Sequence, residues 1–292
     1  CSPAYVARSA SGHAGLLWRR RPLVKTIADP KTSPELRKKL ELVVAVRRYA
    51  FDQLALKSSR DYETWTPVKG AVLTWLVFAS ERLQLRSHEF RFPLAGSFPY
   101  KGHFRKDLAE REAAALEREG YDAAVSGSAA YNTPLPISDP LPSSLLSYDA
   151  GALAETLIHE LAHGTLYVKN RTEFDEAVAT WIGLRGAEAF LRERFGEDSL
   201  EMKEWREGLA GRKLGDDLYR ELKDMLTALY EGPEGAAEKL EKRKAIFEWA
   251  RRQAASRGVS VAEPLNNAVV LAHGLYAPDL APFDALFEKN GR

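Results

Sequence analysis

Cysteine is nearly absent from the sequence, because the single one in 292 residues stands at position 1. The chain therefore cannot form an internal disulfide, a zinc ribbon or a Cys-x-x-Cys redox motif. Long apolar runs are missing too, since none reaches the length of about 18 residues that predicts a transmembrane helix. The formal net charge is only +1, so no strong field favours nucleic acid as a partner.

The N-terminus begins with Cys1 and continues with three small residues. A chain numbered from cysteine rather than methionine is expected when a signal peptide has been removed. This start resembles that of a mature bacterial lipoprotein, in which the cysteine carries the lipid. The resemblance implies a lipid anchor through Cys1 and a place in the cell envelope, on the periplasmic face of the outer membrane; an arbitrary chain boundary is the alternative. The run Arg19-Arg20-Arg21 is compatible with anionic lipid headgroups, although a solvated cluster is the simpler interpretation.

The first half of the chain is predicted to combine helices with a small sheet. A Ser-Pro-Glu start and apolar residues at helical spacing predict a helix over residues 33–56. Apolar, β-branched runs at 72–79 and 121–126 predict strands. A charged amphipathic pattern over 106–120 predicts another helix. Residues 1–32 are interpreted as a tether that leads into a short docking segment.

The second half is predicted to be almost wholly helical. The segment 127–148 is rich in Gly, Ser and Pro and is expected to form one wall of a cleft. A helix over 152–168 follows, and a further helix capped by Thr172 continues to about residue 195. Glycine and proline then separate the remaining predicted helices, which cover residues 201–209, 214–230, 234–256, 265–275 and 279–287.

The helix over 152–168 contains His-Glu-Leu-Ala-His at residues 159–163. Histidines four residues apart project from the same helix face, so His159 and His163 can converge on one zinc ion. Glu160 lies next to the first ligand, where it would act as general base toward the attacking water. The alternative is a buried helix that carries two histidines by chance. The preceding apolar residues argue against it, because they supply a core face without the histidines.

A third protein ligand is needed to complete a catalytic zinc site. Glu176 lies thirteen residues after His163, in the first turn of the next predicted helix. A short loop lets that helix pack back on the first one and complete a His₂Glu site. Asp175 is the competing ligand. The long metzincin pattern does not fit, because Leu166 and Lys169 stand where it needs Gly and His.

Peptide hydrolysis also needs a donor for the tetrahedral oxyanion, usually Tyr or His. The candidates are Tyr276 and Tyr131, followed by His273. Each of them is equally compatible with an ordinary half-buried side chain.

Motifs spread over the whole chain carry a resemblance to a known family. They are Cys1 with residues 16–22, then 92–96 with 100–104, 130–133, 159–163, 174–177 and 265–268. Together they resemble the bacterial putative aminopeptidase family, predicted zinc peptidases that are often lipoproteins. Residues 175–179 are similar to the second-ligand helix of gluzincin peptidases. That group often carries an acid where Thr180 stands here, so Glu155 or a backbone carbonyl must fix the tautomer of the first histidine.

The resemblance implies a peptidase with one Zn²⁺ that removes N-terminal residues from peptide substrates. We predict one α+β, zincin-like domain over residues 33–292, with an α/β part at 33–150 and a helical part at 151–292. A zinc endopeptidase acting on envelope proteins and a non-enzymatic envelope scaffold are the alternatives. An aminopeptidase also needs a carboxylate for the substrate's α-amine, for which Glu173 and Asp175 are candidates.

Overall fold

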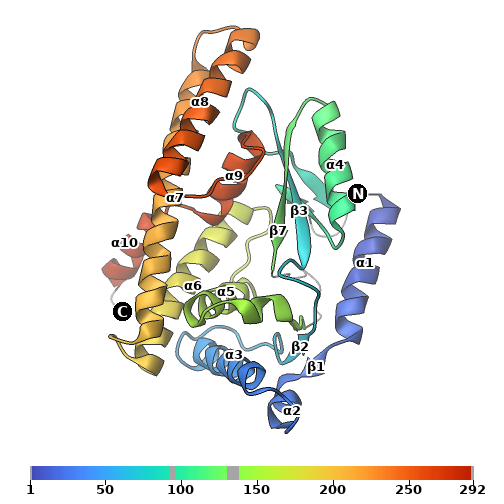
Figure 1. Cartoon of the computed structure of the whole chain (residues 1–292), viewed down its shortest axis with the longest axis vertical. Coiled ribbons are helices and arrows are strands. Elements are labelled where there is room, and N and C mark those ends of the chain that lie inside the picture. The colour runs from blue at the N-terminus through green and yellow to red at the C-terminus, as the bar shows by residue number, and fades with distance from the viewer. Residues whose placement is uncertain (1, 93–95, 130–137, 291–292) are drawn as a thin grey trace.

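A computed structural model describes residues 2–92, 96–129 and 138–290. The fold is α+β, with about 61% helix and small sheets. The long helices α7 and α8 lie along one side of the molecule, and the main sheet lies on the other with α4 and α1 (Figure 1). Among the described residues, no helix combines the length and apolar character needed to cross a membrane. Cys1 and Tyr131 lie outside the described residues.

The helices and strands follow one another in an order that places most strands in the first half of the chain. In chain order they are α1 (Pro3–Trp18), β1 (Arg21–Pro22), α2 (Leu23–Ala28), α3 (Pro34–Asp52), β2 (Thr64–Thr66), β3 (Thr74–Ser80), β4 (Phe90–Phe92), β5 (Gly96–Phe98), β6 (Tyr100–His103), α4 (Lys106–Arg118), β7 (Asp122–Ser128), β8 (Leu141–Pro142), the 3₁₀ helix η1 (Ser143–Ser147), α5 (Ala150–His163), α6 (Thr172–Phe195), α7 (Leu200–Glu231), α8 (Ala236–Arg257), α9 (Asn267–Tyr276) and α10 (Ala281–Asn290).

Strand β3 is the centre of the main sheet, between β6 and β7, and pairs antiparallel with both. The strands predicted at 72–79 and 121–126 are thereby confirmed as β3 and β7. Val77 of β3 and Ala109 of α4 belong to one buried cluster, so α4 covers one face of the sheet. Phe78, on the opposite face, packs into a second cluster with α7, α8 and α9.

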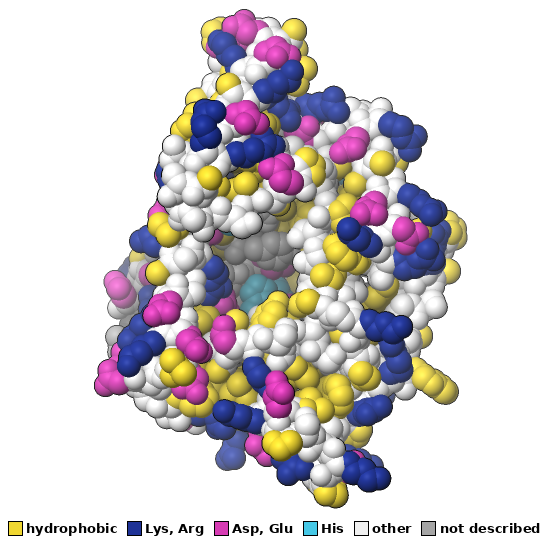
Figure 2. All heavy atoms as spheres, viewed as in Figure 1, with side chains coloured by type: hydrophobic (Ala, Val, Ile, Leu, Met, Phe, Trp, Pro, Cys, Tyr) yellow, Lys and Arg dark blue, Asp and Glu magenta, His cyan; other side chains and the backbone are white. Residues whose placement is uncertain are grey.

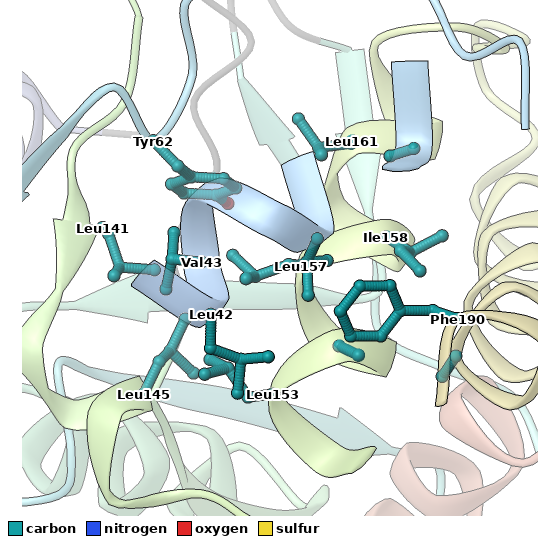
Figure 3. Close-up of a cluster of buried hydrophobic side chains, with 14 of the residues drawn as sticks. Leu42, Val43, Tyr62, Leu141, Leu145, Leu153, Leu157, Ile158, Leu161 and Phe190 are labelled. Carbon is teal, nitrogen blue, oxygen red and sulfur yellow. The ribbon is translucent and has the colours of Figure 1, made fainter. Parts of the chain in front are cut away.

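Helix α5 is buried on one side in the largest hydrophobic cluster of the molecule. Leu153, Leu157 and Ile158 have no exposed surface, and they point toward α3 and α6 (Figure 3). Val43 of α3 and Phe190 of α6 pack against them in the same cluster. The buried residues of α5 recur at three- and four-residue spacing, which leaves the opposite side of α5 to its polar residues.

Helix α7 is one continuous helix, and the two separate helices predicted at 201–209 and 214–230 were wrong. The prediction placed a break at Gly211, because glycine in a helix interior costs about 1 kcal/mol relative to alanine. Burial of apolar side chains on both sides of this glycine, such as Trp205 and Leu222, outweighs that cost.

Residues 3–28, predicted as part of a tether and docking segment, contain the helices α1 and α2. The hydroxyl of Tyr5 donates a hydrogen bond of 2.9 Å to the carbonyl of Gly102 in β6. The hydroxyl of Thr66 donates one of 2.9 Å to the carbonyl of Leu16. Alanine-rich sequence favours a helix here, and these contacts fix α1 against the rest of the chain.

Two asparagines at the start of α9 join this helix to the main sheet. Asn266 donates from Nδ2 to the carbonyl of Ala123 over 2.8 Å. The backbone N–H of Asn267 donates to Oδ2 of Asp122 over 3.1 Å, and its Nδ2 donates to the carbonyl of Glu81 over 2.9 Å. The asparagine pair therefore has a structural role, since it holds α9 in place through buried hydrogen bonds.

Candidate metal centre

The polar side of α5 carries two histidines whose rings meet edge to face. The Nε2 atoms of His159 and His163 are 3.2 Å apart, and the ring planes cross at 85°. Both side chains are half-buried. Figure 2 shows histidine side chains at the bottom of a hollow, where α5 passes in Figure 1. The spacing predicted from the helix period is thus present in the structure.

Helix α6 brings a carboxylate to the two histidines. Oε2 of Glu176 lies 3.3 Å from Nε2 of His159 and 3.9 Å from Nε2 of His163. One donor atom from each of these three residues lies within 4.8 Å of the others. The two helices that carry them are joined by the short segment 164–171 and pack against one another.

A close approach of the two helices explains how Glu176 reaches the histidines. A Cβ atom added at Gly183 would lie 3.0 Å from the carbonyl oxygen of Glu155 and 3.1 Å from Cβ of His159. Any larger residue would therefore push α6 away from α5. Gly183 is two turns after Glu176 on α6, so the glycine sets the distance between the carboxylate and the histidines.

The three side chains fit a zinc ion. Oε2 of Glu176 is buried and, among the described residues, has no hydrogen-bond partner of good geometry. Such an atom is costly unless a further group satisfies it. Two ligands at 2.0–2.1 Å in a tetrahedral zinc site are roughly 3.3 Å apart. The observed separations of 3.2 Å between the histidine nitrogens and 3.3 Å from His159 to Glu176 are close to this value.

The two other acidic residues at the start of α6 have different surroundings. Oδ1 of Asp175 accepts a hydrogen bond of 2.8 Å from the backbone N–H of Val168, so this carboxylate fixes the connecting segment. This contact also gives a reason why α5 ends at His163 and not at residue 168. Glu173 is exposed. Thr172, predicted as the cap of α6, is its first helical residue.

Electrostatics at the site favour positive charge. Burial lowers the pKa of His159, but the carboxylates of Glu176, Glu160 and Glu155 outweigh this effect, so the pKa is raised. The excess of carboxylates makes the site attractive to a cation, since a bound cation would offset their charge.

Two tyrosines lie within electrostatic reach of the same carboxylates. Burial, followed by Glu176 and Glu160, raises the pKa of Tyr100. Burial, followed by Glu160 and two aspartates, raises the pKa of Tyr62 well above its ordinary value. Both hydroxyls therefore stay protonated at neutral pH and each can donate a hydrogen bond. Tyr100 begins the edge strand β6 and is half-buried, which makes it a further candidate for the oxyanion donor.

Of the three oxyanion donors predicted from sequence, His273 is the one whose side chain the structure describes. Tyr131 lies outside the described residues, and Tyr276 ends α9 with its side chain not described. Nε2 of His273 lies 2.9 Å from Oδ1 of Asp216, and the His273 ring stacks on Tyr219 at 3.9 Å. These three residues line a cavity of about 770 Å³ between α7 and α9.

Glu155, a candidate for orienting His159, is bound by a residue of α7. Nη1 of Arg212 lies 2.7 Å from Oε1 of Glu155. Arg212 also lines the cavity between α7 and α9. Glu155 precedes His159 by one helical turn, so this cavity adjoins α5.

A family model described as putative aminopeptidase matches residues 4–292. The chain belongs to this family. No curated protein and no solved structure matches the chain. Membership of the putative aminopeptidase family confirms the resemblance drawn from the motifs and indicates a peptidase, whereas the zincin-like architecture stays a prediction.

The sequence did not predict that Gly183 and Tyr100 of this aminopeptidase-family chain lie at or near the candidate site. Gly183 lies inside a long helix. An isolated glycine there either lowers helix stability or allows a neighbouring helix to come close, and the close approach of α5 was not predicted. Tyr100 lies in one of the motifs that carried the family resemblance, but no position was assigned to its side chain. The asparagines at 266–267, also part of such a motif, serve α9 instead of the site.

Proposed function

We propose that the protein is a zinc-dependent peptidase in which His159, His163 and Glu176 hold the metal. The observation that carries the proposal is the buried, unsatisfied Oε2 of Glu176 beside two converging imidazole nitrogens. Family membership supports the peptidase part of the proposal. Zinc bound there would supply Lewis-acid polarisation of the substrate carbonyl and an acidified water.

In this proposal, side chains of the protein carry out the proton transfers and stabilise the oxyanion. Glu160 is half-buried on α5 directly after the first ligand, and it accepts the proton of the attacking water. The same carboxyl group then passes that proton to the leaving amine. A tyrosine hydroxyl donates to the oxygen that becomes negatively charged, and Tyr100, Tyr276 and Tyr131 are the candidates.

The zincin-like fold and the aminopeptidase specificity belong to the same proposal. A helix that carries both histidines below a small antiparallel sheet supports the first. The family description supports the second. Of the two carboxylates predicted for the substrate's amine, Asp175 is buried and bound to the backbone N–H of Val168, which leaves the exposed Glu173 as the better candidate.

Digestion of a mixed peptide pool, read by mass spectrometry, tests the proposed function. We expect loss of single N-terminal residues that stops when a chelator removes the metal and returns when zinc is restored. Internal cuts with the same metal dependence would assign an endopeptidase. Absence of cleavage by a preparation shown to contain zinc would contradict the proposal and favour the envelope scaffold.

Replacement of each candidate tyrosine by phenylalanine identifies the oxyanion donor. We expect one of Tyr100→Phe, Tyr276→Phe and Tyr131→Phe to lower kcat by about 10²–10³. Zinc content should stay at the level of the unchanged protein, because no tyrosine is among the proposed ligands. Steady-state kinetics and metal analysis of the three variants make the measurement. Unchanged kcat in all three would remove tyrosine from the mechanism.

A lipid anchor through Cys1 in the cell envelope is proposed as well, on the sequence of the N-terminus. Incorporation of labelled fatty acid into the protein, and its loss in Cys1→Ser, measures this directly. A chain that carries no fatty acid when expressed with its own export signal would exclude the anchor.

A further inference from the structure

The first 28 residues have an unusual balance of charge. They contain five basic residues and no acidic one. The basic residues are Arg8, Arg19, Arg20, Arg21 and Lys25. All five side chains are exposed, and in the described part of the chain none of them forms an ion pair. Because the whole chain has a net charge of only +1, the remaining residues together carry −4.

Large apolar side chains are exposed in the same segment. Trp18 is 91% exposed and Val24 is 73% exposed, the two highest values among the large hydrophobic residues of the described chain. Val6 is 51% exposed. Val6, Ala10, Ala14 and Trp18 follow one another at four-residue spacing on α1, so they form one exposed apolar stripe. The stripe runs about 18 Å along the helix.

A basic hollow lies next to the end of this stripe. A cavity of about 450 Å³ is lined by Arg21, Lys25 and Lys31, among other residues. The guanidinium of Arg21 lies 5.8 Å from the centre of the Trp65 ring, which forms part of the wall. Asp29 is the acidic residue of the lining, and its Oδ1 already accepts the backbone N–H of Lys31 over 2.9 Å. The hollow therefore offers three cationic side chains to an anion.

We propose that this surface docks on an anionic lipid bilayer. It is called the N-terminal docking surface here and consists of Trp18, Arg20, Arg21, Val24 and Lys25, with the adjoining hollow. The cationic side chains bind lipid phosphates, one of which occupies the hollow. Trp18 and Val24 enter the interfacial region between headgroups and acyl chains.

Basic and exposed apolar side chains lie together on this surface, and that combination favours an anionic bilayer as the partner. Each basic residue close to an anionic membrane surface adds to binding, and tryptophan is enriched at the membrane–water interface. A nucleic acid would satisfy the cations but would leave the apolar side chains in water. A bilayer covers both kinds of side chain at once, as in proteins that lie on membranes through a basic, apolar-edged segment.

The positions of α1 and α2 in the molecule allow the docking surface to contact a bilayer. Helix α1 lies along one edge of the molecule and α2 at one end (Figure 1). In the lower part of Figure 2, near these elements, Lys and Arg side chains gather on the surface. The docking surface is built from residues 18–25 and the lining of the adjoining hollow, so the inference depends neither on the peptidase activity nor on a lipid at Cys1.

Vesicle binding of the full chain without a lipid on Cys1 tests the inference. Co-sedimentation would use vesicles of phosphatidylcholine alone and vesicles with about one third phosphatidylglycerol. We expect binding only to the anionic vesicles, with a marked loss between low and high salt. A blue shift of tryptophan fluorescence should accompany binding and should be lost in Trp18→Phe, which separates insertion from simple charge attraction.

Two charge variants with equal net charge locate the contact. Arg20→Ser, Arg21→Ser and Lys25→Ser combined should weaken vesicle binding at least tenfold. The control combines Arg118→Ser, Arg252→Ser and Lys203→Ser, three exposed cations elsewhere, and should bind like the unchanged chain.

Three results would overturn the inference. The first is no binding of the folded, unchanged chain to anionic vesicles. The second is an equal loss in both triple variants, which would show only a response to net charge. The third is unchanged fluorescence of Trp18 together with tighter binding to RNA than to vesicles, which would assign the surface to nucleic acid.

Discussion

Glu160→Gln is expected to lower kcat for peptide hydrolysis by about 10³ while the protein keeps its zinc. The amide has the size of the carboxyl group but cannot accept the proton of the attacking water. His159, next in the chain, keeps its ring in place because its own contacts with His163 and Glu176 do not involve residue 160. Steady-state kinetics and metal analysis on one preparation make the measurement.

Glu155→Gln is the matched control for this variant. The residue is also a glutamate of α5, but its carboxylate is bound by Arg212 and, in the described part of the chain, makes no hydrogen bond to His159. The structure therefore does not support the predicted role of Glu155 in fixing the His159 tautomer. We expect a loss far smaller than that of Glu160→Gln. Full activity of the Glu160 variant would contradict the assigned role, and loss of zinc from it would show that Glu160 supports the metal site.

The second large effect is expected at Gly183, although this residue touches no substrate. In Gly183→Ala the new Cβ meets the carbonyl of Glu155 at 3.0 Å and Cβ of His159 at 3.1 Å. Relief of this contact moves α6 outward and takes Glu176 with it. Overpacking of this kind costs about 1–3 kcal/mol, which corresponds to roughly a tenfold to hundredfold loss of zinc affinity.

Competition with a zinc-binding dye measures this affinity. Gly208→Ala is the control, because Gly208 is an exposed helical glycine with nothing within 4 Å of the added Cβ. It should bind zinc normally and gain slightly in stability, as alanine favours the helix. A zinc affinity in Gly183→Ala equal to that of the control would show that the helix spacing does not set the position of Glu176.

The grouping of His159, His163 and Glu176 could be predicted from the sequence because these residues are close together in the chain. The helix period fixes the relation of His159 to His163, and a short connection folds the next helix back on them. The choice of Glu176 over Asp175 followed from spacing, and in the structure Asp175 is bound to the backbone of the connecting segment. These are local relations, which the sequence expresses directly.

Relations between distant segments were not predicted. The contact of Tyr5 with Gly102, which fixes α1, joins residues 97 positions apart. The bond from Asn267 to Asp122 spans 145 positions, and nothing in the local sequence distinguishes it from a site amide. In the same way, Tyr100 of β6 comes within electrostatic reach of Glu160 and Glu176 only through the way the chain folds. Such positions depend on how the sheet and helices are stacked.

The connection of α5 to α6 by one short loop affects the order in which the metal ligands and the substrate-binding groups come together during folding. All three proposed ligands lie within residues 159–176, so the entropy of bringing them together is that of closing one short loop. The tyrosines proposed to act on the peptide come instead from segments as far apart as Tyr100 and Tyr276. We therefore expect that a partly folded chain, with these two helices packed together and the sheet unpaired, already holds a metal but cannot yet position a peptide.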